Sequence, residues 1–261
     1  ERNKNMDTYA FGFYGDVAAG NRVGTDYTTG TVTVDVTTGA VTGSGTTFTS
    51  AMVGRGFKAT GHTKWYRVKT FSSTTSIVIE DDLDDATSAY TGGAIGAGAT
   101  YTIEAVTAVS VTLLNVLSKV AALKLKLDKA EANSKSSVPM EGRWLIVPPE
   151  FETIVTTGAT GIALHVPEVY NELVKKGMLG MLQGFKVFVS NRLTGDNTNG
   201  YRVLAGHPNW MTFAEKVLEV GIEEDLIGNF GSAYKDLFVY GGKVTDSRRH
   251  FAAEGFFTFN V

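Results

Sequence analysis

A cluster of acidic side chains is the first feature of this chain that could do chemistry. Four aspartates, Asp81, Asp82, Asp84 and Asp85, flank a single leucine. Carboxylate oxygens are the ligands that Ca²⁺ prefers, and four of them could hold the ion if the backbone wrapped them around one centre. A solvated charged turn that protects a strand edge explains the same residues with fewer requirements. We therefore predict a turn here.

Two further features, the segment 195–200 and the four histidines, are candidate metal sites. The segment GDNTNG, residues 195–200, resembles part of a calcium loop, but Gly195 stands at its first ligand position and no acidic residue closes it. A hairpin turn explains the segment better. The four histidines are His62, His165, His207 and His250. None shows the i, i+4 pairing of a helical zinc site, and the chain has no cysteine, so we predict no metal ion and no cofactor.

Glu150 and Glu152 are the candidates for acid–base catalysis, as in a carboxylate-based hydrolase. They follow Pro148-Pro149 at the start of a predicted helix. The helix dipole by itself favours acidic side chains in that first turn, so we favour the structural explanation. Only a closed pocket that holds both carboxylates would support catalysis.

Three glycine-containing patterns fail as nucleotide-binding or nucleophile motifs. Gly242-Lys243 is followed by valine and has Leu237 where a P-loop needs its first glycine. The cluster from Gly92 to Gly98 lacks both the dinucleotide fingerprint and a following helix, so we predict a loop. Gly43-Ser44-Gly45 has its glycines next to the serine, whereas a nucleophile elbow has them two positions away. We predict no catalytic residue and therefore no enzyme.

Four aromatic residues, Trp65, Tyr66, Tyr90 and Tyr101, lie in a threonine-rich region. Aromatic rings on an exposed face could stack against sugars. The alternative is that these rings fill the core of a small β-domain, and we favour that alternative.

The elements that must position these residues fall into regions of different texture. Met6 to about Ala19 suits a short helix that ends at Gly20. From about Thr28 to Glu104 the chain is rich in Thr, Gly, Ser and Val, and apolar residues alternate with polar ones. Predicted strands there are residues 32–36, 65–71, 76–79 and 100–103. This pattern predicts a small all-β domain.

The region after Glu104 mixes helices with strands. Apolar residues from Val109 to Leu127 recur at intervals of three and four, which predicts an amphipathic helix to about Ala132. Further helices are predicted at residues 151–155, after the two prolines, and 167–176. Strands are predicted at residues 143–147, 185–190, 201–205, 211–223, 234–240 and 251–261. This half of the chain therefore belongs to the α+β class.

Composition limits the possible partners. Lys plus Arg number 24 against 27 Asp plus Glu, and the net charge is -3, so the chain lacks the positive field of a dedicated DNA-binding protein. Hydrophobic residues make up 43% of the sequence, enough for a substantial core. No stretch approaches the ~18 uninterrupted apolar residues of a spanning helix, so we expect no membrane partner.

Several segments together resemble the major capsid (coat) proteins of tailed bacteriophages. The longest is KLKLDKAEANSKSSVPMEGRWLIVPPEFETIV, residues 124–155, where a helix ends and the next begins after two prolines. GFKVFVSNRL at 184–193, AGHPNWMTFAEKV at 205–217 and the YKDLFVYGGKV run within 230–244 follow in the order of that family. Residues 6–20 are similar to the end of its long spine helix.

The resemblance implies the tailed-phage major capsid fold, with an axial and a peripheral domain. Residues 1–27 would be the end of the spine helix and a connection in the peripheral domain. Residues 28–104 would be an inserted all-β domain that projects outward from the axial domain. Residues 105–261 would form the axial domain and the return to the peripheral sheet.

The implied function is that of a structural subunit of an icosahedral phage or prophage shell. Such subunits assemble into hexamers and pentamers that enclose double-stranded DNA. The expected partners are further copies of the chain, other capsid or decoration proteins, and DNA through non-specific contacts. The expected location is the virion, and the host cytoplasm during assembly.

The N-terminal arm, extended loop and most of the spine helix of the family are missing from this sequence, which begins with Glu1. We therefore expect a processed product or fragment that is monomeric or weakly associated in dilute solution. The alternative function is a phage-associated protein whose β-module binds carbohydrate or another surface.

Overall fold

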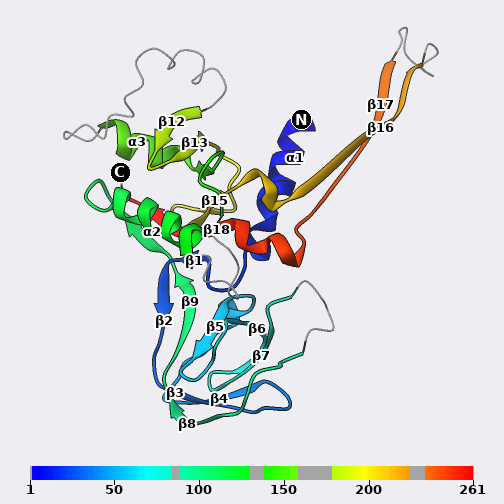
Figure 1. The fold of residues 1–261 in the computed structure, drawn as a ribbon. Coiled ribbons are helices and arrows are strands. Elements are labelled where there is room, and N and C mark those ends of the chain that lie inside the picture. The colour runs from blue at the N-terminus through cyan, green and yellow to red at the C-terminus, as the bar shows by residue number, and fades with distance from the viewer. Residues whose placement is uncertain (1, 84–88, 130–137, 158–177, 224–232, 261) are drawn as a thin grey trace.

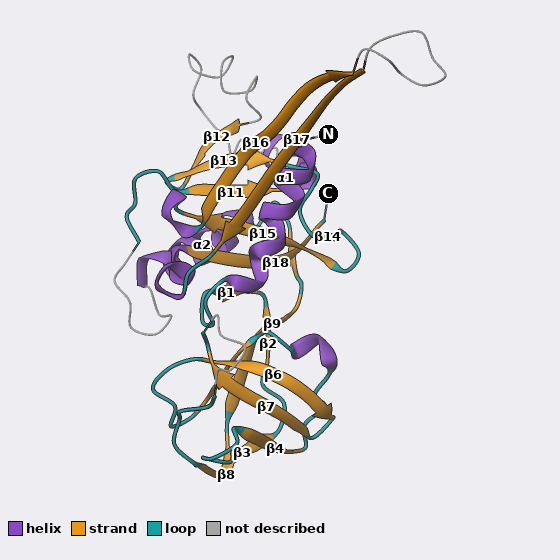
Figure 2. Cartoon of the chain, turned by 90° about the vertical axis from the view of Figure 1, so that its right-hand side faces the viewer, coloured by secondary structure: helices purple, strands orange, loops and turns teal. Residues whose placement is uncertain are grey.

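The computed structural model describes residues 2–83, 89–129, 138–157, 178–223 and 233–260. Their strands form two large sheets and a separate two-stranded ribbon (Figure 1). We call the first sheet with its helices the body, the second sheet the barrel, and the pair β16–β17 the ribbon. The barrel lies at one end of the molecule, and the ribbon projects from the other end (Figures 1 and 2).

The body is built on a mixed sheet with the strand order β1-β18-β15-β11-β13-β12; β10 also pairs with β18, and β14 with β15. Strand β11 runs parallel to β13 and antiparallel to β15. The strands are β1 (Arg22–Val23), β10 (Val109–Val111), β11 (Trp144–Val147), β12 (Met178–Leu182), β13 (Phe185–Val189), β14 (Gly195–Asp196), β15 (Gly200–Gly206) and β18 (Ala252–Phe259). These positions confirm the predicted strands at 143–147, 185–190, 201–205 and 251–261.

Helices α2 (Val116–Lys129) and α3 (Pro149–Thr157) bury their apolar faces in the core of this sheet. Leu123 and Leu127 of α2 and Phe151 of α3 belong to one cluster with strand residues such as Leu145 and Phe257. Burial of each such side chain contributes about 1.5–3 kcal/mol of hydrophobic free energy. The helix predicted after the two prolines is confirmed, because a proline is well suited to the first helical turn.

The predicted start of the long helix at Val109 is wrong. Val109, Ser110 and Val111 form β10, which pairs in parallel with Phe257, Thr258 and Phe259 of β18. The helix begins only at Val116, and Leu114 between them is 96% exposed. Pairing with a strand far away in the sequence thus overrides a spacing that suits a helix.

The N-terminal prediction is also wrong at its end. Helix α1 covers Arg2–Phe11, and a 3₁₀-helix follows at Gly12–Asp16. Val17 has an extended backbone, and Ala18 and Ala19 are buried outside any helix. The chain leaves the helix early because residues 17–22 pack between the body and the barrel.

The barrel contains β2 (Thr25–Tyr27), β3 (Thr31–Val34), β4 (Ala40–Ser44), β5 (Gly56–Ala59), β6 (Tyr66–Ser73), β7 (Ser76–Asp81), β8 (Ile95–Ala99) and β9 (Tyr101–Thr107). Its order is β2-β9-β5-β6-β7-β4-β3-β8. Strands β8 and β9 are separated only by Thr100 and together form one bent strand. Its β8 half pairs with β3 at one end of the strand order, and its β9 half pairs with β5 near the other end. The sheet therefore closes on itself around an apolar core.

Two predictions in the barrel need correction. Residues 95–99 of the glycine cluster form β8 and are not part of a loop. Val36 ends the predicted strand at 32–36 but lies outside β3 and is 50% exposed. Asp35 starts a turn there, in which its carboxylate accepts hydrogen bonds from the N–H groups of Thr37 and Thr38. Gly39 closes this turn at φ +66°, and a Cβ there would collide with the carbonyl oxygen of Ile79. Strands β2, β4 and β5 lie outside the strands that the sequence predicts.

The ribbon consists of β16 (Thr212–Glu223) and β17 (Ala233–Lys243), which pair antiparallel from Thr212–Lys243 to Glu223–Ala233. Both strands were predicted. At its base, the ring of Tyr9 from α1 packs edge-on against Tyr240 at a centroid distance of 5.5 Å. Elsewhere the ribbon projects beyond the body (Figure 2).

The helix predicted at residues 167–176 lies outside the described residues. The boundaries at 27/28 and 104/105 remain predictions about domain organisation. Among the helices of the described ranges, none has both the length and the apolar character needed to cross a bilayer.

Candidate functional site

The two chain segments that join the barrel to the body lie next to each other. Strand β1 enters the barrel and β10 leaves it, and both pair in parallel with β18. Arg22 of β1 is opposite Glu254, and Val109 of β10 is opposite Phe257. The barrel thus begins and ends at neighbouring positions along one strand.

Glu254 is the centre of this junction. Its carboxylate is fully buried and accepts hydrogen bonds from three arginines. The distances are 2.9 Å from Arg22 Nε to Oε2, 3.0 Å from Arg55 Nη1 to Oε1 and 2.9 Å from Arg202 Nη1 to Oε1. Arg55 comes from the barrel and Arg202 from β15, so one carboxylate links three segments that are far apart in the sequence.

Glu104, near the end of the barrel, provides the second carboxylate. It accepts hydrogen bonds from Arg22 Nη1 at 2.9 Å and from the backbone N–H of Gly20 at 2.9 Å. Burial raises the pKa of Glu104 above its ordinary value, although Arg22 acts in the opposite direction. Burial alone would lower the pKa of Arg22, but the carboxylates of Glu104 and Glu254 raise it. Each charged group therefore offsets part of the desolvation of the other.

A second ion pair crosses the junction nearby. Asp82 at the end of β7 lies 2.8 Å from Nη1 of Arg249, and both side chains are almost completely buried. The other oxygen of Asp82 accepts a hydrogen bond from the backbone N–H of Ala19. The backbone of Gly20 packs closely against the Trp65 ring, because a Cβ at this position would lie 2.6 Å from the ring.

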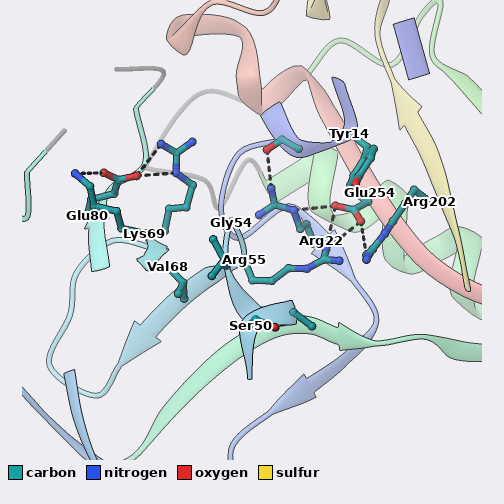
Figure 3. Close-up of a pocket in the computed structure, with 14 residues that line it drawn as sticks. Tyr14, Arg22, Ser50, Gly54, Arg55, Val68, Lys69, Glu80, Arg202 and Glu254 are labelled. Atoms are coloured by element: carbon teal, nitrogen blue, oxygen red, sulfur yellow. Dashed lines mark hydrogen bonds and ion pairs between the residues drawn. The ribbon is translucent and has the colours of Figure 1, made fainter. Parts of the chain in front are cut away.

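A polar cleft of about 480 Å³ opens beside this cluster. Arg22, Arg55, Arg202 and Glu254 lie along one side of it, and Lys69 with Glu80 lies on the other side (Figure 3). Arg202 is held in place by stacking, with its guanidinium carbon 3.5 Å from the centroid of the Phe256 ring. The tertiary structure assembles this cleft from residues of both the body and the barrel.

The sequence did not single out any residue of this cleft. Arg22, Arg55, Arg202 and Glu254 are widely separated and belong to no motif. One signal was available: Glu254 interrupts the apolar run of β18, where the burial pattern is continuous. A lone carboxylate in a buried strand needs cationic partners, which the sequence cannot name.

The aspartate cluster is divided between other partners. Asp81 accepts hydrogen bonds from Lys64 at 2.7 Å and from the hydroxyl of Thr91 at 2.7 Å. Asp82 faces Arg249 instead, and Asp84 and Asp85 lie outside the described residues. Within the ranges that the structure describes, no group of three or more potential ligands gathers to hold a metal ion.

The segment 195–200 forms the predicted hairpin turn between β14 and β15. Asp196 accepts hydrogen bonds from the N–H groups of Thr198 and Asn199, both at 2.7 Å. These bonds lower the pKa of Asp196. The carboxylate is engaged by its own turn.

His62 and Tyr90 form a hydrogen-bonded chain inside the barrel. His62 Nδ1 accepts from the N–H of Ala59, which leaves Nε2 to donate to the Tyr90 hydroxyl at 2.8 Å. That hydroxyl donates to the carbonyl oxygen of Gly93 at 2.6 Å. Desolvation, with Lys58 nearby, lowers the pKa of His62 to about 4, so its ring is neutral at neutral pH. This arrangement is that of a core histidine with its hydrogen bonds satisfied.

The other two described histidines, His207 and His250, have separate surroundings. His207 accepts a hydrogen bond from the N–H of Asn209 and caps a short 3₁₀-helix. His250 is buried and its ring lies 4.5 Å from that of Phe251. His165 lies outside the described residues.

The structure does not support an aromatic sugar platform from the four residues considered. Tyr66, Tyr90 and Tyr101 are buried in the barrel core, and only Trp65 is half-buried. The Tyr101 ring stacks on Phe57 at 5.6 Å. Three of the four aromatic residues therefore fill the core of the barrel, as the preferred prediction stated.

Glu150 and Glu152 do not converge. Glu150 accepts a hydrogen bond from the Tyr201 hydroxyl at 2.8 Å and is half-buried, whereas Glu152 is exposed on the same helix. Burial and the neighbouring Glu150 raise the pKa of Tyr201 to about 12. The described residues form no closed pocket that holds both carboxylates.

The glycine motifs lie in ordinary secondary structure. Gly242 and Lys243 end strand β17, and the N–H of Gly242 donates to the Tyr9 hydroxyl. Gly43 and Ser44 end strand β4. Neither segment has the strand–loop–helix geometry of a phosphate cradle or a nucleophile elbow.

Comparison with known proteins identifies the family. The family described as phage capsid protein matches residues 72–253, well over half of the chain. The chain belongs to this phage capsid protein family. The family is structural, so the resemblance seen in the sequence is confirmed at this level, and its members are components of the virion.

One solved chain, from Mycobacterium phage Che8, is similar at 20% sequence identity with a TM-score of 0.40. The similarity covers 59% of this capsid-family chain and 53% of the Che8 chain, so about half of that longer relative is spanned. None of the curated proteins matches the sequence.

Proposed function

We propose that this capsid-family protein is a shell subunit that assembles into hexamers and pentamers around double-stranded DNA. Its family membership carries the proposal. The ribbon gives physical support, because a two-stranded sheet is marginally stable alone in water. Leu237 and Val239 on β17 are each about half exposed, so a neighbouring copy has apolar side chains to cover.

We also infer the division of labour within the chain. Residues 1–27 and the ribbon belong to a peripheral domain, and the body sheet with α2 and α3 belongs to an axial domain. The predicted insertion at 28–104 corresponds to the barrel, whose strands extend from Thr25 to Thr107, and it projects from the shell. Adjacent pairing of β1 and β10 on β18 supports an insertion, because a loop whose ends lie together can be lengthened at little entropic cost.

The remaining partners follow from the same proposal. Shell copies contact one another, other capsid or decoration proteins bind the assembled surface, and DNA is contacted without sequence preference. The net charge of -3 fits a protein whose main partner is itself. Assembly would take place in the host cytoplasm.

The copy number of the protein in purified particles tests this function. Particles of the phage that encodes the chain are banded in a density gradient, and their proteins are quantified by mass spectrometry. A shell subunit is expected to be the most abundant protein and to form the symmetric lattice seen by electron microscopy. A handful of copies per particle, or none, would contradict a shell role and would favour an accessory surface-binding protein.

A further inference from the structure

We propose that the cleft between the barrel and the body binds a small phosphate-bearing molecule, with its phosphate group between Arg55 and Arg202. The proposal concerns ligand binding and stands independently of shell assembly. It rests on the charge, the hydrogen-bond donors and the size of the cleft.

Positive charge exceeds negative charge at the inner wall. Three arginines form ion pairs with Glu254. Among the described carboxylates, Glu104 is the only other one that forms an ion pair with these arginines, and it does so with Arg22. The side chains of Arg55 and Arg22 are at most 7% exposed, so water screens their charge poorly. An anion in the cleft would offset the remaining cation.

The arginines also have hydrogen-bond donors to spare. Each guanidinium has five N–H donors. Within the described ranges, Arg55 and Arg202 each donate through Nη1 alone, in both cases to Glu254. Their Nε and Nη2 groups make no hydrogen bond to these parts of the protein, although both side chains line the cleft. The planar arginine fork matches the oxygen atoms of a phosphate group.

The geometry of the site is already fixed before a ligand arrives. Arg202 is stacked on Phe256, and Arg55 lies over the same ring at 5.4 Å. Fixed donors lose little conformational entropy on binding. A volume of about 480 Å³ exceeds that of one phosphate ion and falls within the range of small-molecule pockets. A phosphate group with further atoms attached therefore fits better than a single inorganic ion.

Calorimetric titration of the full chain with pyrophosphate tests the proposal. The titration is done in a buffer without phosphate or sulfate, and sodium chloride of matched ionic strength is the reference. Saturable binding of one pyrophosphate per chain is expected. Arg202→Gln should weaken it about tenfold, as expected for loss of one charge-assisted hydrogen bond.

Two further variants make the result decisive. Arg192→Gln changes an arginine in a loop outside the cleft lining. This variant should keep the affinity within about twofold, because salt screens the charge of an arginine outside the site. Arg55→Gln should weaken binding like Arg202→Gln, and if it fails to fold, the less buried Arg202 variant decides.

Absence of saturable binding in the millimolar range, equal effects of Arg192→Gln and Arg202→Gln, or an equal response to sodium chloride would each overturn the proposal. Binding of duplex DNA without binding of pyrophosphate would overturn it as well.

Discussion

The barrel and the ribbon are both antiparallel β-structure with alternating sequences, yet they bury their apolar residues differently. In the barrel, Phe57, Ile77 and Ile103 are completely buried because the bent strand β8–β9 closes the sheet. In the ribbon, β16 pairs with β17 and with no other strand of the described ranges, and Leu237 and Val239 remain about half exposed. Period-two alternation therefore does not show whether a strand pair completes its own core.

The difference separates two roles. A closed barrel gains stability from its own contacts and can sit at the edge of a molecule without a partner. An open ribbon has two unpaired edges and a partly exposed apolar face, which are features of association surfaces. In a capsid-family protein, we expect mutations in the barrel to change folding and mutations in the ribbon to change assembly. Four measurements test this contrast.

The largest expected effect is that of Phe57→Ala in the barrel core. Phe57 is fully buried and stacked on Tyr101, so the variant should lose about 3–5 kcal/mol of unfolding free energy. Urea denaturation of the full chain measures the loss, and hydrogen exchange should place it in β5–β9. Val36→Ala, at an exposed turn of the same barrel, is the control and should cost less than about 0.5 kcal/mol. Similar losses for both variants would show that the barrel has no independent core.

Glu254→Gln tests the junction that couples the barrel to the body. Removing the charge leaves three arginines around a neutral amide, and breaking a buried ion pair in this way costs about 3 kcal/mol. Denaturation should show the loss, and small-angle scattering should show a wider distribution of barrel positions. Glu141→Gln, at an exposed position, is the matched control. Unchanged stability in Glu254→Gln would mean that apolar contacts alone hold the junction.

Acidification should weaken the barrel through His62. Its pKa is about 4 in the folded protein against 6.5 in a model compound, so the unfolded chain binds the proton first. This contribution is complete above pH 6.5 and is lost as the pH falls towards 4, by up to about 3 kcal/mol. Denaturation at several pH values measures the slope, and His62→Gln should flatten it. A slope that is the same in His62→Gln would assign the acid sensitivity to the carboxylates.

The smallest effect on folding is expected for Leu237→Thr combined with Val239→Thr in the ribbon. Both side chains are about half exposed and threonine suits a strand, so the unfolding free energy should change by less than about 0.5 kcal/mol. Sedimentation velocity should nevertheless show weaker self-association than in the unmodified chain. Val36→Thr on the barrel is the control and should associate normally. Loss of stability without loss of association would reverse the roles assigned to the two regions.

Local patterns predicted much of the fold. Strand patterns located β3, β6, β7, β9, β11, β13 and β15–β18, and the two prolines located α3. The errors occurred where distant pairing decided the outcome. Val109 and Val111 pair with β18, and the glycine cluster supplies β8 to the closed barrel. A window of neighbouring residues does not contain that information.

The sequence by itself determined the family resemblance, the absence of cysteine chemistry and most of the strands, because these depend on residue types and spacing along the chain. It also indicated that Tyr66, Tyr90 and Tyr101 could fill a core. Only the tertiary structure decided that Arg22, Arg55 and Arg202 meet at Glu254. Their meeting depends on barrel closure and on the parallel pairing of β1 and β10 with β18. These strand pairs join Arg22 to Glu254, 232 positions apart, and Val109 to Phe257, 148 positions apart, through packing that no local pattern encodes.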